Sequence, residues 1–231
     1  MKNLTWRNLF FFSLIVSSCF AQNNTHFTIF SSQGKIVNSS QYYKEPYRPQ
    51  FHFSPEKKWM NDPNGMLYYK GTYHLFYQYY PEDIVWGPMH WGHATSADLI
   101  HWQHQKIALF PDELGYIFSG SAVMDLDNTS GLGTKENPPM IAIFTYHNME
   151  FEKAGKINTQ TQGLAYSLDE GATWKKHEAN PIIDNLNLKD FRDPKAFWNE
   201  ETKKWNLVLV AGDRAQFYTS RNLLQWKLES E

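Results

Sequence analysis

The chain has 231 residues, a formal net charge of −2 and no run rich in Lys and Arg, so a nucleic acid is not expected as a partner. The length suits one large or two small domains. Aromatic residues make up 16 % of the chain, which favours a core built from β-strands.

Residues 1–21 have the pattern of a cleaved secretory signal peptide. Basic residues precede the apolar run 9–16, and Ala21 suits the last position before cleavage. The run is too short to span a bilayer well, so we expect no membrane association once the signal is removed. The only cysteine, Cys19, lies inside the signal, so the mature chain would hold no disulfide. A secreted, extracellular glycoprotein also fits the Asn-x-Ser/Thr sequons at Asn23, Asn38 and Asn128.

The remaining chain divides into a polar arm and a strand-rich part. Residues 22–48 are polar and weakly periodic, which predicts an arm, whereas residues 49–231 are almost entirely strand-like. The segments 65–69 and 73–79 flank Lys70-Gly71-Thr72 and predict a hairpin. Similar strand pairs recur further on, and no segment has a sustained helical period.

A degenerate repeat occurs three times, at 95–102, 166–174 and 219–226. Each copy contains the end of a strand, a Ser, a polar turn and a Trp that leads into an outer strand. A unit of about 50 to 70 residues with about four strands suits a propeller blade, although the repeat alone also fits other all-β solenoids or sandwiches. The predicted blades cover residues 60–108, 117–178 and 191–228.

Two aspartates stand directly before prolines, in Trp59-Met60-Asn61-Asp62-Pro63-Asn64-Gly65 and in Phe191-Arg192-Asp193-Pro194. Proline pushes the preceding residue toward an extended backbone, so each Asp is expected to be extended, with its carboxylate held in a defined direction. Two carboxylates aimed from a rigid β scaffold are what the cleavage of a sugar requires. Taken singly, the first string also fits an ordinary β-turn and the second a structural Arg–Asp ion pair.

These strings belong to an ordered set of five motifs, completed by Tyr73–Gln78, Trp86–Ala94 and Phe118–Ser121. In this order the set resembles the invertase/β-fructofuranosidase family, glycoside hydrolase family 32, over about residues 48–231. The resemblance implies an all-β, five-bladed β-propeller, of which this chain would contain about three blades. It also implies hydrolysis of sucrose or related β-fructosides with retention of configuration, and a small sugar as the partner.

The resemblance also implies roles for individual residues. Asp62 corresponds to the nucleophile and Asp193 to the carboxylate that stabilises the transition state. Arg192 would pair with a carboxylate, and Asn61 would bind the sugar or orient Asp62. The substrate contacts would come from Gln78, Trp86, Phe118 and Ser119, whereas we expect Trp91 and Trp102 to pack in the core.

A metal ion or other cofactor is not implied. Four histidines, His90, His93, His101 and His104, are close in sequence, but residues three apart in a strand point to opposite faces. The chain also has no glycine-rich loop of the phosphate-binding type.

One departure from the family pattern concerns the proton donor. The family's general acid/base is a Glu in a Trp-Glu-Cys-Pro string, which the sequence lacks; Glu229 and Glu231 come too early and without that context. We therefore expect a truncated form, inactive or impaired by about 10²–10⁴ in leaving-group departure. A fructan hydrolase or fructosyltransferase, and a non-catalytic fructoside-binding module, remain alternatives.

Overall fold

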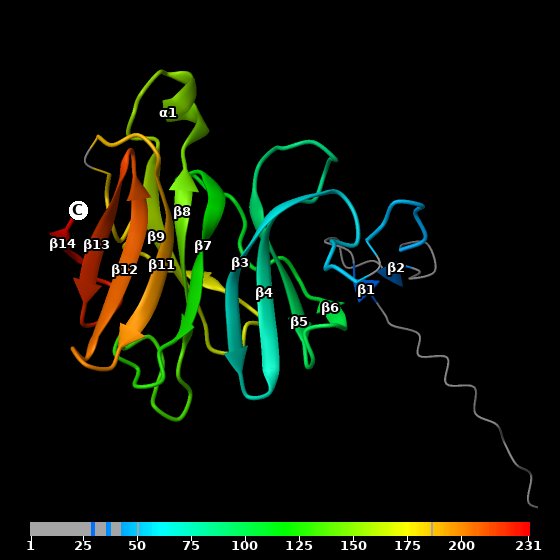
Figure 1. Cartoon of the computed structure of the whole chain (residues 1–231), viewed down its shortest axis with the longest axis horizontal. Helices are drawn as coiled ribbons and strands as arrows, with labels where there is room; N and C mark the ends of the chain where they lie inside the picture. Colours follow the sequence, from blue (N-terminus) through cyan, green and yellow to red (C-terminus); the bar gives the residue numbers. More distant parts are fainter. Residues whose placement is uncertain (1–28, 31–35, 38–42, 50, 186) are drawn as a thin grey trace, which may run out of the picture.

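The computed structural model describes residues 29–30, 36–37, 43–49, 51–185 and 187–231 (Figure 1). The predicted signal peptide and the sequons at Asn23 and Asn38 lie outside the described residues. Within them, no helix is long and apolar enough to cross a membrane. The one helix assigned there is α1 (Met149–Lys153), a five-residue segment that hydrophobic periodicity did not predict.

Three antiparallel sheets of four strands each account for most of the described chain, and each sheet uses consecutive strands. Blade one contains β3 (Trp59–Tyr69), β4 (Thr72–Tyr80), β5 (His90–Ser96) and β6 (Trp102–His104). Blade two contains β7 (Tyr116–Met124), β8 (Met140–His147), β9 (Gln160–Ser167) and β10 (Lys175–Lys176). Blade three contains β11 (Phe191–Asn199), β12 (Lys204–Ala211), β13 (Arg214–Ser220) and β14 (Lys227–Ser230). In the arm, β1 (Ile29–Phe30) pairs with β2 (Ile36–Val37).

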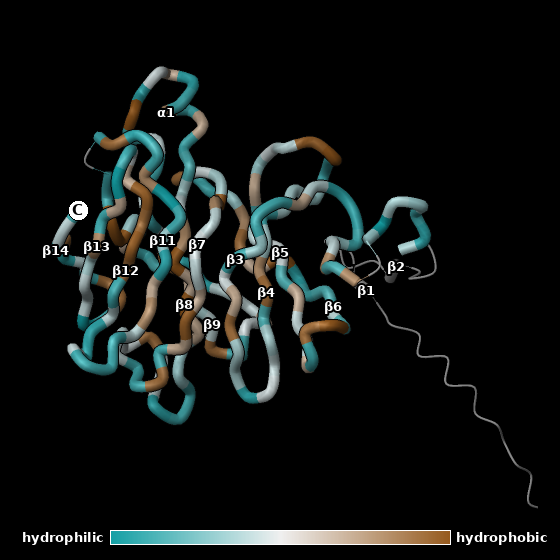
Figure 2. Tube along the Cα trace, viewed as in Figure 1, coloured by the Kyte–Doolittle hydropathy of each residue, from teal (hydrophilic) through white to brown (hydrophobic). Residues whose placement is uncertain are grey.

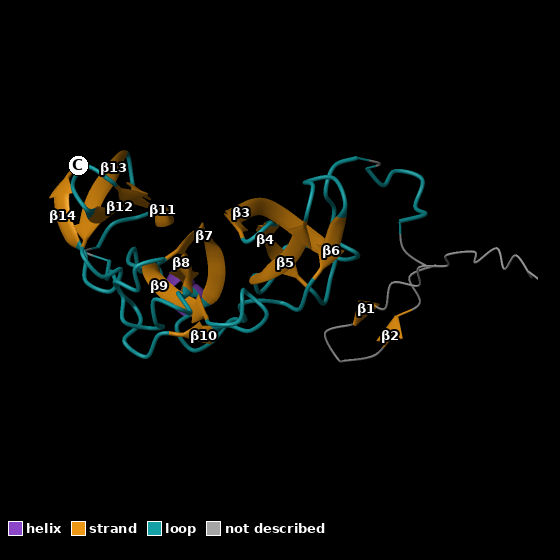
Figure 3. Cartoon of the chain, turned by 90° about the horizontal axis from the view of Figure 1, so that it is seen from below, coloured by secondary structure: helices purple, strands orange, loops and turns teal. Residues whose placement is uncertain are grey.

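The sheets fan out like the blades of a propeller, as expected (Figure 3). The first strand of each blade is innermost, and β7 contacts both β3 and β11. The last strands, β6, β10 and β14, lie outermost. The blade limits agree with the predicted ones to within a few residues, and the predicted hairpin forms by pairing of Tyr69 with Thr72. This geometry brings three strands that are far apart in sequence to one centre.

The Ser–Trp repeat is a hydrogen-bonded turn in each blade. In blade one, the hydroxyl of Ser96 accepts from the backbone N–H of Leu99 at 2.8 Å, and the indole of Trp102 donates to the carbonyl of Leu99 at 3.2 Å. The residue whose carbonyl accepts has a positive φ in every copy: Leu99 (+66°), Gly171 (+88°) and Leu223 (+63°). The tryptophans are therefore fixed by the turn as well as by packing.

The core lies between the blades rather than within one sheet. All eight residues of β8 are buried, because blades pack on both faces of this strand. Ile141 and Ile143 pack toward Trp205 and Leu207 of blade three. The alternate residues Met140, Ala142 and Phe144 pack with Phe76 and Trp91 of blade one. Trp91 is completely buried, in agreement with its expected core role.

A histidine pair is buried where blade one meets blade two. His74 Nδ1 lies 3.1 Å from His93 Nε2, and the side chains are 3 % and 2 % exposed. The ring of Phe76 stacks on His93 with centroids 4.4 Å apart, and Gly171 of blade two faces both histidines. Desolvation, with a smaller contribution from the charge of protonated His74, lowers the pKa of His93 to about 3.

Candidate functional site

Each of the three innermost strands is interrupted by a β-bulge. The register shifts between Asn61 and Pro63 on β3, between Ile117 and Gly120 on β7, and between Arg192 and Lys195 on β11. A bulge bends a strand and redirects its side chains. Asp62, the pair Phe118-Ser119 and Asp193 all lie inside these bulges, so the centre of the fan collects the candidate catalytic residues.

Asp62 is held by a residue of the neighbouring blade. The Ser119 hydroxyl donates to Asp62 Oδ2 at 3.0 Å. Ser119 is 9 % exposed, whereas Asp62 is exposed to solvent. One carboxylate oxygen is therefore fixed while the residue remains open to a ligand, which is the condition that a nucleophile needs.

Asp193 sits at the equivalent bulge of blade three, but its backbone is not extended. Its φ is +59°, so the expectation that Pro194 keeps it extended is wrong. Asp is among the few residues that adopt this left-handed conformation readily. The backbone N–H of Asp193 donates to Thr145 Oγ1 at 3.1 Å, which anchors the bulge to blade two.

The charge of Asp193 is set by three competing effects. Desolvation raises the pKa of its carboxyl, the guanidinium of Arg192 lowers that pKa, and the negative charge of Asp62 raises it. Arg192 Nε lies 3.6 Å from Asp193 Oδ2, and its other end donates to Asp190 at 2.7 Å. The two predicted acids thus lie close enough to influence each other, with a cation beside one of them.

Buried side chains from the preceding blade donate to backbone carbonyls in the bulges and directly beside them. Gln78 donates to the carbonyl of Ile117 at 3.0 Å, and Trp91 donates to that of Phe118 at 3.0 Å. In the next pair of blades, Gln162 donates to the carbonyl of Phe191 at 2.8 Å, and Ser121 donates to that of Pro194 at 2.9 Å. Gln78 is 3 % exposed, so one amide hydrogen already serves this structural bond. Its predicted contact with substrate stays a prediction.

Aromatic side chains form one wall beside the carboxylates. Trp86 and Phe118 meet edge to face with centroids 6.2 Å apart, and Trp86 is 43 % exposed. Both line a cleft of about 460 Å³ that also includes Arg192. Trp86 belongs to the loop between β4 and β5, whose hydrophobic stretch is brown in Figure 2. A cleft of this size, with aromatic residues on one side and charged side chains on the other, suits a small polar ligand.

The structure therefore gathers most of the predicted residues at one centre. Ser119 bonds to Asp62, Asp193 is near enough for its pKa to be affected by the charge of Asp62, and Trp86, Phe118 and Arg192 line the adjoining cleft. Asn61 lies beside Asp62 and accepts from the indole of Trp59 at 2.8 Å, while Gln78 lies beneath, in the β3–β4 pairing.

Sequence reasoning missed several residues of the cleft. These come from the end of β8, from α1 and the loop that follows it, and from the segment before β11: His147, Glu152, Lys156, Ile157, Thr159, Gln160, Lys189 and Asp190. No local motif marks them, because they reach the cleft only through the packing of blades two and three.

The histidines that suggested a metal lie in separate surroundings. His93 is in the blade interface, His101 pairs with Asp98, and His104 is hydrogen-bonded to Tyr43. Among the residues that the structure describes, no group of three or more His, Cys, Asp or Glu side chains could hold a metal ion.

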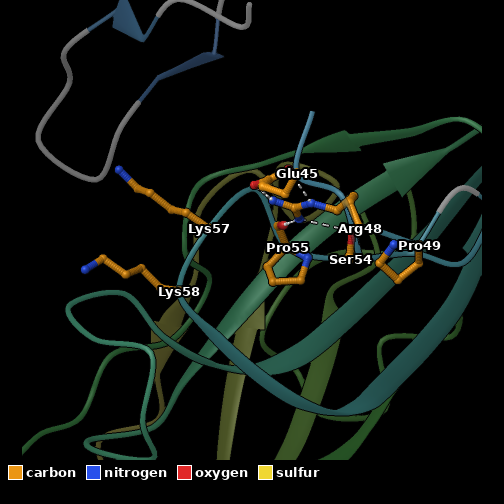
Figure 4. A pocket seen from close by; sticks show the side chains of 7 residues that line it. All are labelled: Glu45, Arg48, Pro49, Ser54, Pro55, Lys57 and Lys58. Carbon is orange, nitrogen blue, oxygen red and sulfur yellow. Dashed lines mark hydrogen bonds and ion pairs between the residues drawn. The ribbon is translucent and has the colours of Figure 1, made fainter. Parts of the chain in front are cut away.

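A second hollow, of about 400 Å³, lies on the arm side of blade one (Figure 4). Arg48 occupies its floor and is bound to Glu45, Ser54 and the carbonyls of Pro55 and Glu56. Lys57 and Lys58 point away from it in Figure 4. The guanidinium bonds the arm to the segment that leads into β3, so the residues of this hollow have a structural role.

The comparisons with known proteins agree with this geometry. Residues 52–231 match the family described as "Glycosyl hydrolases family 32 N-terminal domain". The chain is 58 % identical over 192 residues to a levanase of Bacillus subtilis, covering 83 % of the chain and 27 % of that protein. It is 47 % identical over 208 residues to an extracellular exo-inulinase of Aspergillus niger, covering 82 % and 39 % respectively.

A solved structure shares the same fold. The fructofuranosidase of Schwanniomyces occidentalis, complexed with fructose, superimposes with a TM-score of 0.72 at 43 % identity, over 84 % of this chain and 37 % of that one. The chain thus spans well under half of each relative. A match over most of its length, shared with relatives at 58 % and 47 % identity, shows that the chain belongs to glycosyl hydrolase family 32.

Proposed function

We propose that the chain carries the nucleophile and the transition-state stabiliser of a retaining hydrolase that cleaves the β-fructofuranosyl bond of sucrose or related fructosides. The observation that supports this most is the Ser119–Asp62 hydrogen bond at 3.0 Å, combined with the influence of the Asp62 charge on Asp193. Two carboxylates from separate blades at one centre are what double displacement requires.

In the proposed reaction, a carboxylate oxygen of Asp62 attacks the anomeric carbon of the fructosyl group. The bond from that carbon to the leaving oxygen breaks, and a fructosyl ester forms on Asp62. Asp193 accepts hydrogen bonds from ring hydroxyls that strengthen as positive charge develops. The wall made by Trp86 and Phe118 excludes water from one side of the ring.

Proton donation to the leaving oxygen is the step that we expect to be weak. Glu229 binds Thr219 and Lys227, and Glu231 binds Gln216 and Arg214, at the outer edge of blade three. Neither carboxylate lies at the centre where β3, β7 and β11 meet. Without a proton from either of these two carboxylates, departure of a sugar alcohol should slow by about 10²–10⁴.

A substrate whose leaving group needs no proton allows attack by Asp62 to be measured separately from proton donation. We would incubate the chain with β-fructofuranosyl fluoride and measure its intact mass. Fluoride leaves without protonation, so the chain should gain one fructosyl residue on Asp62. Asp62→Asn, with a nearly equal side-chain volume, should gain none. A wild-type chain that binds fructose but acquires no label would support a non-catalytic binding module instead.

A fructan hydrolase is the second candidate, favoured by the 58 % identity to a levanase. Calorimetry with sucrose and with levan oligosaccharides distinguishes the substrates, since a fructan site should bind the longer sugar more tightly. Product analysis at high sucrose concentration separates hydrolysis from transfer, because a fructosyltransferase would form longer sugars.

We also infer that the chain is a secreted glycoprotein. The basic and apolar pattern of residues 1–21 and the extracellular exo-inulinase relative support secretion. Expression of the whole chain in a secreting host, with the N-terminal sequence of the product, tests cleavage after Ala21. Enzymatic removal of N-glycans before mass analysis tests the three sequons.

A further inference from the structure

His147 lines the same cleft as Phe118 and lies against its ring. Its ring stacks on Phe118 with centroids 4.3 Å apart and only 3° between the planes. His147 ends β8 and is 6 % exposed, whereas Phe118 is partly exposed at the cleft. The contact is flat and extensive, so it constrains the tilt of the phenyl ring.

Both ring nitrogens of His147 are engaged. Gln160 Nε2 lies 3.2 Å from Nδ1, and Glu152 Oε2 lies 2.7 Å from Nε2. An amide nitrogen can only donate, so Nδ1 accepts and Nε2 carries the hydrogen that is donated to Glu152. The imidazole is therefore fixed in orientation by one residue on β9 and one on α1.

The backbone around Phe118 is fixed as well. Its carbonyl accepts from Trp91, and the next residue, Ser119, bonds to Asp62. The phenyl ring also meets the indole of Trp86 in an edge-to-face arrangement. With its backbone held, the Phe118 side chain can still rotate, and His147 is the ring that stacks flat against it.

We propose that His147 is a positioning residue, which sets the plane of Phe118 beside the nucleophile and is itself held from α1 by Glu152. This inference rests on the proposed function, since it concerns the same site. It gives α1, a helix of one turn that belongs to no blade, a defined task.

The kinetic test uses the whole chain and β-fructofuranosyl fluoride. The concentration for half-maximal labelling should rise about three- to tenfold in His147→Ala, with a smaller change in the limiting rate, because an aromatic pair contributes about 0.5–1.5 kcal/mol. His147→Phe keeps the stacking and should stay within about twofold of wild type. Glu152→Gln weakens the hold of α1 on His147 and should also raise that concentration. Glu150→Gln on the same helix is its matched control, since Glu150 pairs with Lys153, lies outside the cleft and should have no effect.

A second measurement does not depend on catalysis. In NMR spectra of the chain with labelled phenylalanine, the Phe118 signals, assigned with Phe118→Leu, should be displaced by the histidine ring current. They should move in His147→Ala. Unchanged Phe118 signals in that variant would overturn the proposal, as would equal impairment by His147→Phe and His147→Ala. If wild type acquires no label while the NMR result holds, the proposed function fails and the positioning role stands.

Discussion

The buried pair His74–His93 should make the stability of the protein depend on pH. The free histidine pKa of 6.5 falls to about 3 for His93 in the folded chain, because desolvation disfavours the charged form. Above pH 6.5 both folded and unfolded chains hold a neutral His93, and the stability is complete. As the pH falls from 6.5 toward 3, the unfolded chain binds a proton that the folded chain excludes, so stability is lost.

The size of the effect follows from linkage. One pH unit corresponds to about 1.4 kcal/mol for one excluded proton, so lowering the pH from 6.5 to about 5 costs about 2 kcal/mol. Desolvation lowers the pKa of His74 as well, and the charge of Glu170 only partly opposes this. Glu170 itself pairs with Lys70 at 2.8 Å. Neither gives His93 a carboxylate partner that would offset this loss.

Urea unfolding at pH 7.5 and 5 provides the assay. The wild type should lose about 2 kcal/mol more than His93→Phe, which keeps an apolar ring against Phe76 but cannot titrate. His52→Phe is the matched control, because it is the same substitution at an exposed histidine and should leave the difference between the two pH values as in wild type. Equal losses in wild type and His93→Phe would refute the reasoning.

Three further changes test the site. Ser119→Ala removes the donor to Asp62, the proposed nucleophile, and should slow labelling by fructosyl fluoride about 10- to 100-fold, as expected for a hydrogen bond to a charged group, with an unchanged circular dichroism spectrum. Arg192→Gln removes a cation that lowers the pKa of Asp193. That pKa should rise further, so the acid limb of the labelling rate should move to higher pH; an unmoved profile would contradict this. Gln162→Leu removes the buried donor to the carbonyl of Phe191, and urea unfolding should show a loss of about 1–3 kcal/mol, against little change for the exposed Gln103→Leu.

Local chemistry explains the parts of the fold that could be predicted from the sequence. The turn at Lys70-Gly71 uses positive φ at both residues, and the Ser–Trp turns close within eight or nine residues. Such features depend on neighbours in the chain, so they are readable in one dimension. These turns allowed the approximate limits of the strands and of the three blades to be predicted.

The site was predicted by motif, but its physical cause was only partly predicted. The backbone of Asp193 is turned by a bulge whose N–H is bound to Thr145 of another blade, and no proline rule contains that information. The same holds for Gln78, whose partner Ile117 is 39 residues away. No sequence motif marks His147 or Glu152. The stacking of His147 on Phe118 and its bond to Glu152 depend on how β8 and α1 pack.

The side-chain donors to the carbonyls at the bulges all lie in the blade that precedes the accepting strand. Gln78 and Trp91 serve carbonyls of β7, and Ser121 and Gln162 serve carbonyls of β11. During synthesis the N-terminal segments leave the ribosome first. The donor side chains of each blade are therefore synthesised before the innermost strand whose carbonyls they bond. The candidate site would therefore form stepwise, in the order of translation. In a chain with permuted blades, an accepting strand would be made before the side chains that donate to it.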